Sequence, residues 1–330
     1  MEQRPFGKTN LTVSAIGFGA WGIGGPAMAG TTPIGWGDVD DATSIAALTR
    51  AFERGITFFD TADFYGLGHS EELIGKVFGN RNDVRIASKV GHRLREDGSI
   101  VLDYSKDYIL EACEKSLKRL RRDRIDYYQL HSAKVSHLAQ GECIEALERL
   151  KHQGKIGFWG VSLNTFHPEP EANFLIDHHL GDGLQLVLNI LNQRALPIIE
   201  KASAAGYGII ARMPLQFGLL TGKFTRATTF SANDHRAFRL PPSILDRALE
   251  ALEEVWPAAE ERGISKASFS LSFCASIAGV STVIPGIKTP EQVERNTADI
   301  LPLKKGELKK LDLLFKNKLS SVVEAMEKEG

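Results

Sequence analysis

The sequence predicts an α/β protein of the (β/α)8 (TIM) barrel class, with an N-terminal β-hairpin and a C-terminal helical extension. Eight short apolar segments, rich in β-branched and aromatic residues, alternate with segments of helical periodicity. Most of the eight are nearly continuously apolar, which is typical of parallel strands covered on both faces. No linker interrupts the alternation, so we expect residues 1–330 to form one domain. A count of eight favours a closed barrel over an open doubly wound sheet.

The predicted strands are spread along the whole chain. In order they are VSAIGFG (13–19), ITFFD (56–60), VRIAS (84–88), IDYYQL (125–130), IGFWGVS (156–162), LQLVLNI (184–190), YGIIARM (207–213) and STVIPG (281–286). Residues 1–12 are expected to form a hairpin that closes the bottom of the barrel. Residues 303–330 have the charged, amphipathic pattern of a C-terminal helix.

Helical periodicity is clearest in four segments between the strands. Apolar side chains recur every three or four residues in these segments, as expected for helices that pack one face against a barrel. Ser105 is a candidate cap for the first of them, and Gly154 is a candidate end for the second. The segments are residues 107–121, residues 141–153, residues 244–256 and the stretch that begins with Thr289 as cap and Pro290 in the first turn.

Two long loops follow predicted strands, at residues 22–40 and 214–242. Loops after the strands of a barrel lie at its C-terminal mouth, where active sites of this fold class form. The first loop begins within GFGAWGIGG, which has the glycines of a dinucleotide fingerprint but lacks the G-x-G-x-x-G spacing and does not lead into a helix. A Rossmann domain is therefore not expected.

The composition excludes several classes of protein. The 40 basic and 41 acidic residues give a net charge of −1, which favours binding to neither nucleic acid nor an anionic membrane surface. No apolar segment has the length of a membrane span, and the N-terminus lacks the apolar core of a signal peptide. The three cysteines are too few and too far apart for a disulfide framework or a zinc site, so we expect a cytoplasmic protein without a bound metal.

Polar side chains occur at the C-terminal ends of three consecutive strands. Asp60 ends the second strand and Tyr65 follows it, Lys89 ends the third, and His131 ends the fourth. Each residue alone has an ordinary explanation: a helix cap, a loop aromatic, a solvated charge and a core histidine. Because these strand ends are neighbours at the mouth of a barrel, however, we expect the four side chains to lie within reach of one another.

The four groups together favour proton donation to a carbonyl oxygen. A phenol has an ordinary pKa near 10, and a nearby ammonium group is expected to lower the pKa of Tyr65 by stabilising the phenolate. Asp60 would offset the desolvation of the Lys89 ammonium, and His131 would orient the carbonyl or assist the proton transfer. Such an acid requires a hydride donor to complete a reduction.

In its order of motifs the sequence resembles the aldo-keto reductase superfamily, in particular its bacterial NADP-dependent members. The resemblance extends over nearly the whole chain and includes RPFGKTNLTVSAIGFGAW, DTADFYGLGHSEELIGK, IASK, IDYYQLH, GKIGFWGVS, PLQFGLLTGKF and VIPGIKTPEQVERN. It implies a (β/α)8 barrel that binds NADPH in an extended form at the strand ends and reduces an aldehyde or ketone. It also implies that Asp60, Tyr65, Lys89 and His131 are the catalytic residues.

The same resemblance implies a path for the cofactor. Ser162 and Gln185 stand at the positions that hold the nicotinamide carboxamide, while Arg212 stands where many relatives have an aromatic residue stacked on the ring. Lys288 and Arg295 favour NADP over NAD because they suit a 2′-phosphate. The implied cofactor positions are Ala20, Trp21, Asp60, Ser162, Leu163, Gln185, Arg212, Met213, Pro214, Leu215, Gln216, Phe217, Gly218, Lys223, Arg236, Gly286, Lys288, Gln292, Arg295 and Asn296.

The substrate and two other readings stay open from the sequence. Trp21, Trp36, Phe64 and His92 are expected to line a partly aromatic pocket for a small carbonyl compound. Lys89 could instead form a Schiff base, as in aldolases of the same fold class. Alternatively, the protein could be a cofactor-bound regulatory or redox-sensing subunit with little turnover. The sequence does not determine the oligomeric state, although a barrel needs no partner to bury its core.

Overall fold

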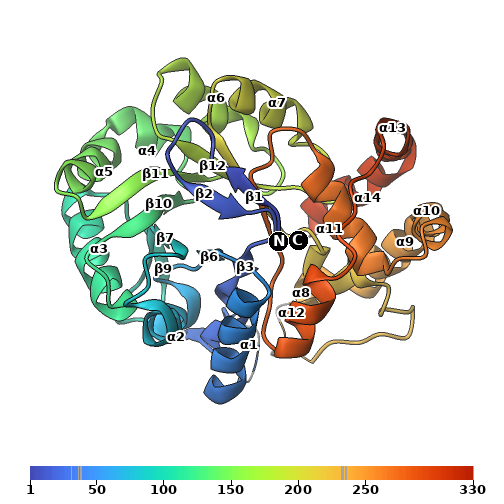
Figure 1. The fold of residues 1–330 in the computed structure, drawn as a ribbon, viewed down its shortest axis with the longest axis horizontal. Helices are drawn as coiled ribbons and strands as arrows, with labels where there is room; N and C mark the ends of the chain where they lie inside the picture. The colour runs from blue at the N-terminus through green and yellow to red at the C-terminus, as the bar shows by residue number, and fades with distance from the viewer. Residues whose placement is uncertain (31, 36, 38, 232–233, 235, 330) are drawn as a thin grey trace.

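The computed structural model describes residues 1–330 except residues 31, 36, 38, 232, 233, 235 and 330. Eight parallel strands form one sheet in the order β14-β13-β12-β11-β10-β7-β6-β3. Bridges between Ile16 and Val283, and between Gly19 and Gly286, join the two ends of this sheet and complete the ring. Figure 1 shows the helices arranged around this ring. The predicted (β/α)8 barrel is confirmed.

Each barrel strand overlaps one of the eight predicted segments. Short strands are sufficient because the neighbours on both sides supply the hydrogen-bond partners. The strands are β3 (Phe18–Gly19), β6 (Phe58–Asp60), β7 (Arg85–Val90), β10 (Ile125–His131), β11 (Ile156–Ser162), β12 (Gly183–Val187), β13 (Gly208–Arg212) and β14 (Thr282–Ile284).

The first predicted strand, residues 13–19, is divided between two structures. Strand β1 (Gln3–Pro5) pairs with β2 (Thr12–Ser14) in an antiparallel hairpin that lies across one end of the barrel (Figure 1). Residues 13 and 14 therefore belong to the predicted hairpin and not to the barrel wall. The physical reason is that Val13 packs with Phe6 in the cluster that closes the barrel interior.

Eight helices accompany the barrel strands in sequence. They are α1 (Asp41–Glu53), α2 (His69–Phe78), α3 (Lys106–Leu120), α5 (Glu142–His152), α6 (Glu169–Asp177), α7 (Leu196–Ala204), α11 (Lys266–Ser276) and α12 (Pro290–Thr297). The predicted start of α12 is confirmed, since the Thr289 side chain accepts a hydrogen bond from the backbone N–H of Gln292. Ser105 occupies the N-cap position of α3, but its side chain makes no capping hydrogen bond.

Further elements lie in the loops and at the C-terminus. They are η1 (Ala20–Gly24), β4 (Met28–Ala29), β5 (Thr32–Pro33), η2 (Tyr65–Gly68), β8 (His92–Leu94), β9 (Ile100–Leu102), α4 (Val135–Gln140), η3 (Gln216–Thr221), α8 (Arg236–Arg239), α9 (Pro242–Leu252), α10 (Trp256–Glu261), α13 (Lys305–Leu314), the π-helix η4 (Phe315–Leu319) and α14 (Ser320–Glu329). The prediction of a single helix over residues 244–256 is wrong. The segment divides into α9 and α10 because Pro257 lacks an N–H donor and is accommodated only in the first turn of a new helix.

The barrel interior contains a layer of apolar side chains near its bottom. Phe58, Tyr127 and Ile210 belong to this layer, and Phe6 from the hairpin covers it, with its ring centroid 4.9 Å from that of Tyr127. The residues between these inward-facing positions point outward toward the helices. Phe59 is an example, since its ring centroid lies 4.4 Å from that of Phe78 on α2. The hairpin therefore covers the bottom of the barrel interior.

Strand alternation places polar residues directly above this apolar layer. On each of four strands, the residue two positions after a member of the apolar layer also faces inward, because side chains alternate along a strand. These residues are polar: Asp60 on β6, Lys89 on β7, Gln129 on β10 and Arg212 on β13. The expectation that acids and bases from several strands meet at the mouth therefore follows from the pleat of the barrel wall.

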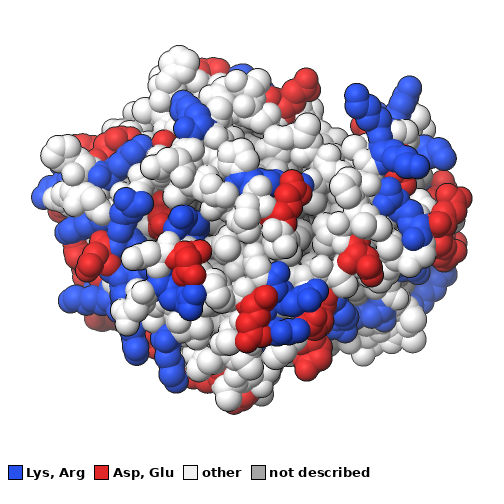
Figure 2. Space-filling model, in the orientation of Figure 1, with Lys and Arg blue, Asp and Glu red and all other residues white. Residues whose placement is uncertain are grey.

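The composition led to expectations about surface charge, membrane spans, metal sites and cysteines, and the structure can be compared with each. On the face shown in Figure 2, basic and acidic residues are interspersed. Among the described residues, no helix is long and apolar enough to cross a membrane, and no group of three or more His, Cys, Asp or Glu could hold a metal ion. Cys113, Cys143 and Cys274 are free thiols buried in the hydrophobic core.

Two glycines in helices allow a test of the helix packing. A Cβ atom at Gly75 in α2 would lie 2.1 Å from the backbone oxygen of Arg119 in α3, whereas a Cβ atom at Gly306 in α13 would meet nothing within 4 Å. We predict that Gly75→Ala lowers the free energy of unfolding by about 1–3 kcal/mol, because the two helices must separate. Gly306→Ala is the matched control and should cause no loss. Urea denaturation of both variants measures the difference, and equal stabilities would contradict the close contact.

Candidate active site

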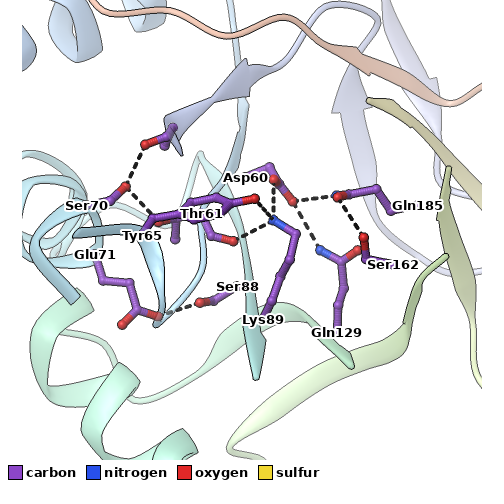
Figure 3. A network of polar contacts seen from close by, with 11 residues as sticks. Asp60, Thr61, Tyr65, Ser70, Glu71, Ser88, Lys89, Gln129, Ser162 and Gln185 are labelled. Carbon is purple, nitrogen blue, oxygen red and sulfur yellow. Dashed lines mark hydrogen bonds and ion pairs between the residues drawn. The ribbon is translucent and has the colours of Figure 1, made fainter. Parts of the chain in front are cut away.

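A buried ion pair lies at the centre of the barrel mouth. The Lys89 ammonium donates to Asp60 Oδ2 at 2.5 Å and to the backbone oxygen of Thr61 at 2.8 Å. It also lies 3.2 Å from the hydroxyl oxygen of Tyr65 (Figure 3). Lys89 is 0% exposed and Asp60 is 2% exposed. The structure thus brings together three of the four residues predicted at the strand ends.

The other oxygen of Asp60 is held by two amides from the barrel wall. Gln129 Nε2 donates to Asp60 Oδ1 at 3.1 Å, and Gln185 Nε2 donates to the same oxygen at 2.7 Å. The hydroxyl of Ser162 in turn donates to Gln185 Oε1 at 3.3 Å. Both carboxylate oxygens of Asp60 therefore have hydrogen-bond donors, and one of these donors is the Lys89 ammonium.

Tyr65 is positioned by a tight turn between β6 and α2. Its backbone N–H donates to the oxygen of Ala62, and the next residue, Gly66, has a φ of +62°. A Cβ atom at Gly66 would lie 2.1 Å from the backbone oxygen of Gly24 in the first loop, so only glycine fits there. The indole of Trp21 stacks at 6.0 Å between ring centroids on the other side of Tyr65. Two separate loops therefore fix the phenol.

Burial changes the expected ionisation of Tyr65. Burial raises the pKa of the phenol above its ordinary value, although the charges of Lys89 and Arg212 each lower it. Lys89 therefore lowers the pKa of Tyr65 as expected, but the desolvation of the phenolate, which the sequence does not reveal, is the larger effect. Tyr65 is consequently protonated at neutral pH. Burial alone would lower the pKa of Lys89, but Asp60 and Tyr65 raise it above its ordinary value, so the ammonium remains charged.

His131 is neutral and lies against Tyr65. Their ring centroids are 5.9 Å apart, and the ring of His92 lies 4.4 Å from that of His131. Burial, followed by the positive charges of His92, Lys89 and Arg212, lowers the pKa of His131 well below its ordinary value. The Tyr104 hydroxyl donates to the His131 backbone oxygen at 2.6 Å and fixes the end of β10. Among the described residues, His131 Nδ1 has no hydrogen-bond partner.

Three of the four predicted pocket residues lie beside these groups. The Phe64 ring lies 5.3 Å from that of His92, and His92 contacts His131, so the two extend the aromatic surface beyond Tyr65. Trp21 closes the opposite side and donates from Nε1 to the backbone oxygen of Ile34. Trp36 lies outside the described residues.

Comparison with known proteins identifies the family. The model of the "Aldo/keto reductase family" matches residues 15–315. The chain belongs to the aldo/keto reductase family. Its reaction class is therefore the oxidation or reduction of a carbonyl–alcohol pair with a nicotinamide cofactor.

Two relatives and one solved structure are similar to the chain over nearly its whole length. It is 31% identical over 302 residues to an "Uncharacterized oxidoreductase YqkF" of Bacillus subtilis, covering 90% of each chain. It is 27% identical over 321 residues to the "NADH-specific methylglyoxal reductase" of Escherichia coli, covering 90% of this chain and 93% of the relative. The structure of the glycerol dehydrogenase AKR11B4 from Gluconobacter oxydans is 28% identical, with a TM-score of 0.80, and the match covers 96% of this chain and 95% of the other.

Positions expected to hold the nicotinamide cofactor of this aldo/keto reductase lie at the ends of β11, β12 and β13. The Ser162 hydroxyl donates a hydrogen bond to the Gln185 side chain, and Gln185 in turn donates one to Asp60. One terminal nitrogen of Arg212 donates to the backbone oxygen of Leu163 at 3.1 Å and to the Thr165 hydroxyl at 3.2 Å. The Leu163 side chain is buried and leaves only its backbone for polar contacts.

The loop from residue 213 to 218 has an unusual backbone. Met213, Gln216, Phe217 and Gly218 all have positive φ angles, a conformation that costs free energy for residues other than glycine and is often kept at binding sites. Asn189 stabilises this loop, since its Nδ2 donates to the backbone oxygen of Met213 and to Gln216 Oε1. The Gln216 side chain therefore supports the loop, while the backbone of residues 213–218, which includes Pro214 and Leu215, borders the mouth.

Basic side chains gather beyond this loop. The charges of Arg236 and Arg295 add to burial in lowering the pKa of Lys223, so these three cations lie close to one another. Lys288 lies near the same group, because its charge helps to lower the pKa of Asp234, which is paired with Arg236. This set of donors suits the phosphate groups of a dinucleotide.

The residues expected to hold the adenosine end lie just before α12 and along it. Gln292 Oε1 accepts from the backbone N–H of Lys288 at 2.6 Å, and Asn296 is buried on the same helix. Gly286 forms a parallel bridge with Gly19 where the barrel closes, and Gly19 is the residue immediately before Ala20. Predicted positions that are distant in sequence are thus neighbours in the structure.

Sequence reasoning missed four residues that support the site. Gln129 could have been found from the sequence, because it is a polar residue in the middle of an apolar strand, two positions before His131. Thr61 contributes only a backbone oxygen to Lys89, and Asn189 acts on a loop more than twenty residues away, so neither has a local signature. Glu71 is fully buried, accepts from Ser88 and pairs with Arg119, which anchors α2 beside the site.

The state of His131 allows a test by pH. Because the pKa of His131 is lowered in the folded protein, the unfolded chain takes up a proton near pH 6.5 that the folded protein does not bind, and stability falls as the pH decreases below that value. We predict that His131→Asn reduces the slope of unfolding free energy against pH between pH 5 and 6.5, by up to about 1.4 kcal/mol per pH unit. Denaturant titrations of the wild type and the variant at several pH values measure this slope. An unchanged slope in the variant would contradict a neutral His131 in the folded protein.

Proposed function

We propose that this aldo/keto reductase uses NADPH to reduce an aldehyde or a ketone to an alcohol, with Tyr65 as the proton donor. The observation that carries the proposal is the Tyr65 hydroxyl, which lies 3.2 Å from an ammonium group that Asp60 holds in place. The bound cofactor supplies the hydride to the carbonyl carbon. The residues of the chain bind the reactants, exclude water and deliver the proton to the carbonyl oxygen.

The roles of the four polar residues follow from their ionisation. Tyr65 is protonated at neutral pH and therefore ready to donate. Lys89 stabilises the phenolate that the transfer leaves behind, and Asp60 keeps Lys89 charged and in position. His131, as a neutral imidazole, has one N–H available to orient the carbonyl oxygen. After the transfer, a proton from solvent restores Tyr65.

The proposed cofactor site extends from the strand ends to α12. Ser162 and Gln185 would hold the nicotinamide carboxamide, and Ala20 and Trp21 would border it. Residues 213–218 with Lys223 and Arg236 would contact the pyrophosphate, because backbone N–H groups and cations suit phosphate oxygens. Gly286, Lys288, Gln292, Arg295 and Asn296 would hold the adenosine end.

The proposed substrate is a small carbonyl compound with an apolar or aromatic portion. The Trp21 ring stacks on that of Tyr65, and the rings of His92 and Phe64 continue outward from His131, so aromatic surface that favours apolar contacts lies beside the proposed acid.

Replacing the proposed acid tests the reaction. Tyr65→Phe keeps the ring that stacks on Trp21 but removes the hydroxyl, so we predict that kcat for carbonyl reduction falls at least about 100-fold. The Kd for NADPH, measured by protein fluorescence quenching, should change less than twofold. Wild-type turnover in Tyr65→Phe would refute the role of Tyr65. Binding of NADPH by the wild type without turnover of any aldehyde or ketone in a broad panel would instead support a regulatory subunit.

The Schiff-base alternative is disfavoured by the state of Lys89. An amine must lose its proton to attack a carbonyl carbon, but the pKa of Lys89 is raised and its ammonium group has three hydrogen-bond partners. Borohydride treatment in the presence of an aldehyde, followed by mass spectrometry of the Lys89 peptide, would detect an adduct if this reading were correct.

The preference for NADPH over NADH requires its own test, since the name of one relative specifies NADH. We predict that the double variant Lys288→Met and Arg295→Met raises the Kd for NADPH about tenfold or more and leaves that for NADH nearly unchanged, because only NADPH carries the 2′-phosphate. Lys223→Met is the matched control and should weaken both, since both contain a pyrophosphate. Equal losses for the two cofactors in the double variant would contradict the assignment.

A further inference from the structure

We propose that Arg212 gives the reaction site an excess positive charge that makes the protein bind NADPH more tightly than NADP+. This inference rests on the proposed function, because it concerns the two redox forms of the proposed cofactor. It goes beyond that function by assigning to one residue the balance between reduction and the reverse reaction.

Arg212 occupies the same inward-facing layer as the ion pair. It ends β13 two residues beyond Ile210, as Asp60 ends β6 two residues beyond Phe58, and both of those apolar residues lie inside the barrel. Its guanidinium group acts electrostatically on Tyr65 and His131, so it lies close to the proposed proton donor. Whatever reacts beside Tyr65 therefore reacts beside this cation.

The partners of Arg212 fix its position without cancelling its charge. The acceptors of its guanidinium are the backbone oxygen of Leu163, the hydroxyl of Thr165 and the sulfur of Met213, all of which are neutral. Its Nε is buried without a hydrogen-bond partner among the described residues. The carboxylate whose charge acts on Arg212 is that of Asp60, which is already paired with Lys89.

The formal charges of Asp60, Lys89, Tyr65, His131 and Arg212 sum to one excess positive charge, and Arg239 acts on Arg212 as a further positive charge. Asp60 and Lys89 cancel, Tyr65 and His131 are neutral, and Arg212 remains charged because a guanidinium does not lose its proton in proteins. A site of this composition disfavours any additional cation and favours negative charge that develops on a carbonyl oxygen.

Hydride transfer changes the charge of the nicotinamide ring. With NADPH bound, its neutral ring would supply a hydride, which is two electrons and one hydrogen nucleus, and would be left with a positive charge, while Tyr65 would give a proton to the carbonyl oxygen. Two unit charges about 10 Å apart, in a medium with an effective dielectric constant of about 20, change a binding ratio by about tenfold or more. Arg212 should therefore weaken the binding of NADP+ relative to NADPH, promote release of the oxidised cofactor and favour carbonyl reduction over alcohol oxidation.

The test compares the two redox forms in three proteins. The Kd values of NADPH and NADP+ are measured by isothermal titration calorimetry for the wild type, Arg212→Met and Arg212→Lys, after circular dichroism has shown that each variant is folded. We expect the ratio of Kd for NADP+ to Kd for NADPH to fall about tenfold in Arg212→Met, equal to about 1.4 kcal/mol. Arg212→Lys retains the charge and should retain most of the wild-type ratio.

A control variant and two outcomes make the inference refutable. Lys223→Met changes the proposed pyrophosphate end, where both redox forms carry the same charge, and should leave the ratio unchanged. An unchanged ratio in Arg212→Met, or an equal weakening of both forms, would overturn the inference and make Arg212 a simple contact residue. Failure of the wild type to bind either form would instead refute the proposed function, so the two failures are distinguishable.

Discussion

The ion pair between Lys89 and Asp60 is the interaction on which the site depends. Both side chains are almost completely buried, and a single charge left unpaired at such a position is strongly destabilising. The pair is compatible with folding because each partner has further hydrogen bonds, from Gln129 and Gln185 to Asp60 and from Lys89 to Thr61. Its geometry fixes an ammonium group 3.2 Å from the Tyr65 oxygen, which neither residue could do alone.

The barrel supplies the surroundings that this pair requires. Inward-facing side chains form an apolar layer below it, and Phe6 from the N-terminal hairpin closes that layer from beneath. The pair therefore has an apolar floor, and the loops after the strands lie on its other side. The same lack of solvent explains why Tyr65 and His131 are neutral, and it leaves Arg212 as the charge that the described residues of the site do not balance.

Much of this arrangement could be predicted from the sequence because its signals are local. Continuous apolar segments indicate parallel strands, and an acid, a lysine and a histidine at successive strand ends indicate a common edge. Where prediction was wrong, a longer-range contact or a special residue was responsible. Val13 belongs to the hairpin because it packs against Phe6, and the helix predicted over residues 244–256 divides at Pro257. Gln129 was missed although its polarity within an apolar strand was a local signal, whereas Asn189 was missed because its partners are remote in sequence.

The sequence by itself determined the fold class, the family resemblance and the identity of the polar residues at the strand ends, because strand periodicity and residue order are properties of the chain alone. The tertiary structure decided how these residues ionise. The sequence indicates that Lys89 is near Tyr65 and should lower its pKa, but only the packed barrel shows that burial outweighs this effect. Desolvation depends on every atom around a group, and those atoms come from segments far apart in the chain.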